Sequence, residues 1–153
     1  MRVYLVQHGE AMLREQDPER PLTQKGIADV RRMGAFLKPL ELAVRTVWHS
    51  KKMRAAETAE FLAKAFEAAE GLVPRDGMGP DDDVEGVLAE IARGGDDLMF
   101  VGHLPFLAKV AGKLLAGDPA AEPVAFRKGG VVCLARTDSG TWQVAWALTP
   151  DVI

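Results

Sequence analysis

The stretch RVYLVQHG at residues 2–9 decides the fold class, because a short, apolar, β-branched run passes directly into a histidine and a glycine. Such a run is typical of a buried strand. A second stretch of the same form, LMFVGHLP, occupies residues 98–105. The two stretches predict two buried strands, each of which ends at a histidine (His8 and His103).

The rest of the chain alternates between helical and extended patterns. Apolar residues recur every three or four positions, as on one face of a helix, over residues 27–37, 55–66, 84–91 and 107–114. A further short strand is expected at residues 46–48, and residues 131–135 and 142–148 are typical of a β-hairpin around Asp138-Ser139-Gly140. We therefore predict one α/β domain over residues 1–153: a three-layer α/β/α sandwich with a mostly parallel mixed sheet.

Composition narrows the classes of function. The 153 residues are 48% hydrophobic and 27% charged, with a net charge of −3, which argues against a general affinity for nucleic acid or an anionic membrane. No apolar run approaches the roughly 20 residues of a membrane span, and no signal peptide is evident. The lone Cys133 lies in an apolar run and is expected to be a buried thiol. A single cysteine fits a reducing compartment, so we expect a cytoplasmic protein.

The two strand-end histidines carry the first functional signal. Ligands of open parallel sheets bind beyond the carboxyl ends of the strands, so neighbouring strands would bring His8 and His103 into one pocket. A single histidine at a strand end is more often structural. The paired occurrence, each beside a glycine that lets backbone approach a ligand, favours a functional site.

A third segment, residues 49–59, places Arg54 in the first turn of a helix that follows a strand. Helix N-termini favour anions, and a guanidinium offers a planar fork to phosphate oxygens. Taken alone, Arg54 would be a solvated side chain of an amphipathic helix. Together with the two histidines, it indicates a phosphate site.

These residues resemble the histidine phosphatase superfamily, whose fold is phosphoglycerate mutase-like, and within it the short phosphohistidine phosphatases of the SixA type. The resemblance rests on four segments in the family's order, and it spans nearly the whole chain. They are Gln7-His8-Gly9-Glu10-Ala11, Arg20-Pro21-Leu22-Thr23-Gln24-Lys25-Gly26, Ser50 with Arg54 to Ala59, and Val101-Gly102-His103-Leu104-Pro105.

The resemblance implies a role for each site residue. His8 would be the nucleophile that forms a phosphohistidine intermediate, and His103 and Arg54 would complete the catalytic group. Phosphate binding would fall to Arg20, Gln7, Gly9 and Ser50. No metal or other cofactor is implied. The expected partner is a phosphorylated protein carrying phosphohistidine, with a small phosphorylated molecule as the alternative substrate.

The chain departs from the family pattern at Gln7, where the family has an arginine. Lys51 or Lys52 could supply the missing charge; alternatively, the domain binds phosphate or a phosphopeptide without turnover. The family pattern also does not identify the general acid in this chain. Residues Asp81, Asp82 and Asp83 are candidates, although adjacent aspartates before a helix are typical of N-caps.

Overall fold

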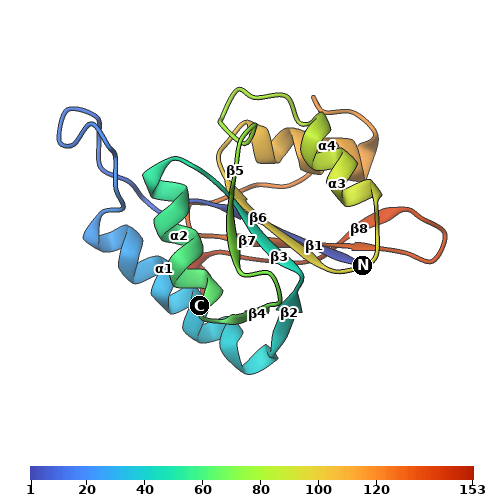
Figure 1. The fold of residues 1–153 in the computed structure, drawn as a ribbon, viewed down its shortest axis with the longest axis horizontal. Helices are drawn as coiled ribbons and strands as arrows, with labels where there is room; N and C mark the ends of the chain where they lie inside the picture. The colour runs from blue at the N-terminus through green and yellow to red at the C-terminus, as the bar shows by residue number, and fades with distance from the viewer.

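The structure, a computed structural model, describes all 153 residues and is built on a six-stranded mixed sheet (Figure 1). The strand order is β5-β3-β6-β1-β7-β8. The four parallel strands are β1 (Arg2–Gln7), β3 (Thr46–Ser50), β5 (Leu72–Arg75) and β6 (Leu98–Gly102). A hairpin continues the sheet: β7 (Val131–Arg136) pairs antiparallel with β1, and β8 (Trp142–Leu148) pairs antiparallel with β7.

Four α-helices cover the two faces of this sheet. On one side lie α1 (Gln24–Leu37) and α2 (Met53–Ala63), and on the other lie α3 (Glu85–Ala92) and α4 (Phe106–Ala116) (Figure 1). Two short 3-10 helices, η1 (Lys38–Leu40) and η2 (Pro150–Val152), follow α1 and β8. The predicted three-layer α/β/α sandwich is confirmed.

Strand β1 is buried on both faces, which explains its uninterrupted apolar run. Successive strand residues point to opposite faces. Tyr4 and Val6 accordingly belong to the core under α1 and α2. Val3 and Leu5 belong to the core under α3 and α4. A strand with a core on either side has no solvated face on which alternation with polar residues could appear.

The prediction for the second helix extends too far. Helix α2 ends at Ala63, and Phe66 begins β4 (Phe66–Ala68), which pairs with β2 (Leu42–Val44) in a small parallel sheet. Phe66 is buried and packs edge-on against Tyr4, with ring centroids 5.3 Å apart. This tertiary contact holds Phe66 in a strand although its spacing in the sequence also suits a helix.

Strand β5 was not predicted from the sequence. It contains Pro74, which cannot donate a ladder hydrogen bond, and it lies at the edge of the sheet, where proline is tolerated. None of the helices is long and apolar enough to cross a membrane.

Candidate active site

The register between β1 and β6 brings the two strand-end histidines together. Gln7 lies opposite Gly102, and the backbone N–H of His8 donates to the Gly102 carbonyl over 3.0 Å. The next residue on each strand is a histidine, and the ring centroids of His8 and His103 are 5.1 Å apart. The two strands are therefore neighbours, which was the condition for His8 and His103 to come together.

His8 is oriented by its own backbone. Its Nδ1 lies 2.7 Å from the carbonyl oxygen of Gly9, which can only accept, so Nδ1 carries the proton and Nε2 keeps its lone pair. The ring is buried, and burial is the main cause that lowers the pKa of His8 to about 4, with the charge of Arg54 adding to the effect. His8 is therefore a neutral imidazole at pH 7 with an unprotonated Nε2.

His103 is oriented by the neighbouring strand. Its Nε2 lies 2.8 Å from the Ser50 hydroxyl, at the end of β3, while its Nδ1 is buried and has no partner. Burial, followed by the charges of His8 and Arg54, lowers the pKa of His103 to about 3. With the Ser50 hydroxyl donating to Nε2, the Nδ1–H of a neutral His103 is free for a ligand.

Arg54 lies in the first turn of α2 and is buried without an ion pair. Its Nε has no hydrogen-bond partner. Burial, then the positive charges of Arg20 and Arg14, lowers the pKa of the guanidinium. A buried charge is normally paired, so this unpaired guanidinium fits an anionic ligand.

Thr58 links the first histidine segment to α2, and the sequence argument gave it no role. Its hydroxyl accepts from the Gly9 N–H over 3.0 Å and donates to the Arg54 carbonyl over 2.7 Å. One side chain therefore fixes the backbone beside His8 against the backbone of Arg54. The spacing from Arg54 to Thr58, one helical turn, was the signal that could have revealed this role.

The segment between β1 and α1 carries Arg20, and after burial its positive charge further lowers the pKa of His8, His103 and Arg54. Arg20 donates from Nε to the Met12 carbonyl over 3.0 Å. Glu57 of α2 accepts from the Leu22 N–H over 2.8 Å. At Gly26 a Cβ would lie 2.1 Å from the carbonyl oxygen of Glu10, so only glycine allows α1 to approach this segment so closely. These contacts explain the Arg20–Gly26 motif.

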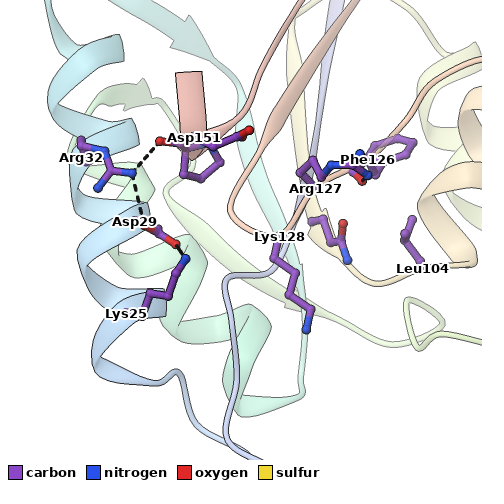
Figure 2. Close-up of a pocket in the computed structure, with 10 residues that line it drawn as sticks. Lys25, Asp29, Arg32, Leu104, Phe126, Arg127, Lys128 and Asp151 are labelled. Atoms are coloured by element: carbon purple, nitrogen blue, oxygen red, sulfur yellow. Dashed lines mark hydrogen bonds and ion pairs between the residues drawn. The ribbon is translucent and has the colours of Figure 1, made fainter. Parts of the chain in front are cut away.

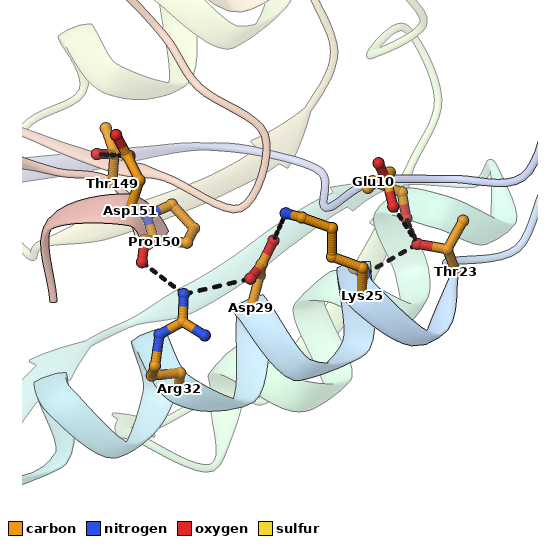
Figure 3. A network of polar contacts seen from close by, with 9 residues as sticks. Glu10, Thr23, Lys25, Asp29, Arg32, Thr149, Pro150 and Asp151 are labelled. Carbon is orange, nitrogen blue, oxygen red and sulfur yellow. Dashed lines mark hydrogen bonds and ion pairs between the residues drawn. The ribbon is translucent and has the colours of Figure 1, made fainter.

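A pocket of about 580 Å³ lies next to this site; Gln7 and Leu104, the chain neighbours of His8 and His103, line it, but the two histidines and Arg54 do not. It is lined by ten residues: Gln7, Lys25, Asp29, Arg32, Leu104, Phe126, Arg127, Lys128, Pro150 and Asp151 (Figure 2). Lys25 and Arg32 both bond to Asp29, and Arg32 also donates to the carbonyl of Pro150 (Figure 3). Lys128 forms no ion pair and points into the hollow between Leu104 and Lys25 (Figure 2).

The candidate general acids line a separate pocket, together with Lys109, Pro119 and Ala120. Asp82 accepts from the Gly79 N–H over 2.6 Å, and Asp83 accepts from the Glu85 N–H over 2.7 Å. Asp83 thus caps the first N–H of α3, as expected for this segment, although the residue directly before the helix is Val84, which makes no side-chain bond. No group of three or more His, Cys, Asp or Glu side chains is arranged to hold a metal ion.

The carboxyl end of the parallel sheet thus carries two neutral histidines, one with a free Nε2, and an unpaired buried guanidinium. This arrangement suits an anion and includes a candidate nucleophile. Residues 3–76 match the histidine phosphatase superfamily (branch 1). An uncharacterized protein of Picosynechococcus sp. is 31% identical over 146 residues, which cover 88% of this chain and 84% of the relative. The chain belongs to the histidine phosphatase superfamily.

Solved structures share the fold over nearly its full length. The protein histidine phosphatase SixA, solved with tungstate, superposes with a TM-score of 0.84 at 24% identity, covering 99% of this chain and 98% of that one. The alpha-ribazole phosphatase of Shigella flexneri gives 0.77 at 13% identity, over 98% and 97% of the two chains. A phosphoserine phosphatase mutant of Entamoeba histolytica, in complex with phosphoserine, gives 0.72 at 14% identity, over 97% of each chain. The expected phosphoglycerate mutase-like fold class is confirmed.

Proposed function

We propose that this chain is a phosphatase that removes the phosphoryl group of protein phosphohistidine through a covalent intermediate on His8. The observation that carries the proposal is the 2.7 Å contact between Nδ1 of His8 and the Gly9 carbonyl, which leaves the Nε2 lone pair available. A neutral imidazole is a competent nucleophile near pH 7, and the lowered pKa of His8 keeps it neutral.

The reaction has two steps that regenerate His8. Nε2 of His8 attacks phosphorus, the P–N bond of the substrate breaks, and the leaving imidazole nitrogen takes a proton from water, which becomes hydroxide. The hydroxide then attacks the phosphorus on His8, the P–N bond to His8 breaks, inorganic phosphate leaves, and the electron pair returns to Nε2. Because imidazole leaves readily once protonated, this substrate class needs less from a general acid than an alkyl phosphate does.

The donors around His8 suit the charge that develops on the phosphoryl oxygens. The Nδ1–H of His103 and the Nε–H of Arg54 are both buried without partners, so each can bond to a phosphoryl oxygen without first breaking a hydrogen bond within the protein. Donors that are fixed before the reaction stabilise the transition state without reorganisation. Arg20, whose charge lowers the pKa of Arg54, adds positive potential at the same place. The charge is supplied by side chains, so we propose that no metal is required.

A protein-borne phosphohistidine is favoured over a small substrate by the short connections that follow β3 and β6. Only residues 103–105 link β6 to α4, and only residues 51–52 link β3 to α2. Neither connection is long enough to form a cap over a small molecule. The likeness in fold to the histidine phosphatase SixA supports the same substrate class.

The test is phosphate release from a phosphohistidine peptide and from an aryl phosphate in the presence of a chelator. We expect wild type to turn over both, the peptide faster, and His8→Ala to turn over neither. A phosphorylated enzyme that is labile to acid and stable to base should be trapped with wild type and be absent from the variant. His49→Asn is the matched control, because His49 is also buried at a strand end but lies outside the family motifs.

A phosphate-binding domain without turnover is the second candidate, and Gln7 is the observation that favours it. If wild type releases no phosphate from either substrate and still binds inorganic phosphate, the binding function replaces the catalytic one. If wild type hydrolyses only small phosphate esters, the site is catalytic and the phosphohistidine assignment is wrong. Chelator-sensitive activity would overturn the metal-free mechanism.

A further inference from the structure

The first motif lacks its arginine, and the structure offers a positive charge from a distant part of the chain. We infer that Lys128 supplies the phosphoryl-binding charge that Gln7 cannot provide, so that Gln7 and Lys128 together replace the motif arginine. This inference rests on the proposed phosphoryl chemistry at His8. It assigns to Lys128 a binding role that no sequence motif indicated.

The loop that carries Lys128 is bonded directly to the strand end that carries His8. The Gly129 N–H lies 3.0 Å from the carbonyl of Gln7 and 3.2 Å from that of His8. The Gly130 N–H donates to the Arg127 carbonyl over 2.8 Å, which closes a turn with Lys128 and Gly129 at its centre. Gly129 has φ +73°, the left-handed value that glycine adopts without strain at this turn position. The backbone of Lys128 is therefore fixed beside the nucleophile.

The side chain of Lys128 points into the pocket that Gln7 also lines (Figure 2). Its ammonium has no ion pair, whereas Lys25 and Arg32 on the opposite wall are both held by Asp29 (Figure 3). The Gln7 amide oxygen is buried and has no hydrogen-bond partner. The free ammonium can engage a phosphoryl oxygen, and the unsatisfied Gln7 oxygen, which lines the same pocket and can only accept, suits the ammonium as its second partner.

The charge of Lys128 already acts on His8. Burial is the largest cause of the lowered pKa of His8, and among the nearby charges Arg54 comes first and Lys128 second. Of the lysines next to the motif, Lys51 forms an ion pair with Asp76 over 2.7 Å, and Lys52 acts on His103. Lys128 is the lysine whose charge acts on His8, so we assign to it the compensation that was expected from Lys51 or Lys52.

A neutral residue at position 7 is consistent with a lysine at position 128. Two cations on the same wall would repel each other in the empty pocket, at a cost that rises as the local dielectric falls. The Gln7 amide can donate to a phosphoryl oxygen and accept from the ammonium. The pair would thus supply one positive charge and one additional donor.

The experiment compares Lys128→Met, Lys128→Arg, Gln7→Arg and the double variant Gln7→Arg/Lys128→Met. Loss of one preorganised charge contact should lower kcat/KM about 100-fold in Lys128→Met. Lys128→Arg should retain most of the activity, and Gln7→Arg should restore the activity of Lys128→Met. Lys109→Met, which removes an exposed lysine from α4, is the matched control and should leave kcat/KM unchanged.

Binding of inorganic phosphate and of tungstate, measured by calorimetry, separates this inference from the catalytic proposal. His8→Ala should still bind both anions, while Lys128→Met should bind them at least about tenfold more weakly. If wild type shows no turnover but Lys128→Met still loses anion affinity, the catalytic proposal fails and the role of Lys128 stands. If Lys128→Met keeps both wild-type turnover and wild-type anion affinity, the inference is wrong.

Discussion

Arg54 and Lys128 both bring positive charge toward His8, but from two different kinds of structure. Arg54 is buried in the first turn of α2, and Thr58 ties its backbone to Gly9, the residue after His8. Lys128 is exposed on a turn between α4 and β7. This turn is held at the site by the Gly129 N–H, which bonds to the carbonyls of Gln7 and His8. A buried cation acts through a low dielectric, whereas an exposed one is weakened by water and salt. Arg54 should therefore contribute more to activity than Lys128, and the contribution of Lys128 should depend more strongly on salt.

The largest effect is expected from Arg54→Met. Removal of the buried guanidinium takes away a positive charge and a planar fork that no other side chain reproduces, so kcat/KM should fall by about 10³-fold. Arg54→Lys should not retain the activity, because an ammonium cannot bind two oxygens in the same geometry as a guanidinium. A steady-state assay with a check of Tm tests this. If Arg54→Met lowers kcat/KM less than Lys128→Met does, Lys128 contributes more than Arg54 and this prediction is wrong.

Acid should destabilise the fold through the two site histidines. The pKa of His8 is lowered to about 4 and that of His103 to about 3, so the unfolded chain binds more protons below pH 6.5. The stability that these groups contribute is complete above the unfolded pKa and is lost as pH falls toward their folded values. Between the unfolded and folded pKa values, the free energy of unfolding should fall by up to about 1.4 kcal/mol per pH unit for each histidine. Urea unfolding between pH 7 and 5 measures it, and His8→Asn should remove part of the slope. A slope that His8→Asn leaves unchanged would show that His8 titrates normally.

Salt should separate the buried cation from the exposed one. Between 0.1 and 1 M salt the screening length falls from about 10 Å to about 3 Å. The activity ratio of wild type to Lys128→Met should therefore shrink severalfold over this range, while the ratio of wild type to Arg54→Met should stay nearly constant. The two ratios are measured side by side with the same substrate. Parallel changes in both would show that Arg54 is as accessible to solvent ions as Lys128.

The smallest effect is expected at the acidic segment before α3. A working general acid contributes about 10²–10⁴-fold, but these aspartates line a different pocket, and two of them accept from backbone N–H groups. We expect the triple change of Asp81, Asp82 and Asp83 to Asn to leave phosphohistidine hydrolysis nearly unchanged. A loss of about 100-fold with Tm preserved would restore one of them as the general acid.

Much of the fold could be predicted because it depends on local patterns. Strands β1 and β6 show continuous apolar runs, α1 begins after the expected cap, and the Thr23 hydroxyl accepts from the Gly26 N–H. The errors occur where a distant contact overrides local preference. Phe66 lies in β4 against Tyr4, and β5 accommodates Pro74 because it lies at the edge of the sheet.

The sequence by itself determined the α/β class and the catalytic candidates His8, His103 and Arg54, because strand ends and helix starts are local features with recognisable residues. Tertiary structure alone decided which charge stands beside Gln7. Lys128 is far from the motif in the chain, and it becomes a neighbour only because β7 pairs with β1 and the turn before β7 bonds to the backbone of Gln7 and His8. Proximity of that kind follows from strand order and register, and no spacing within the sequence encodes it.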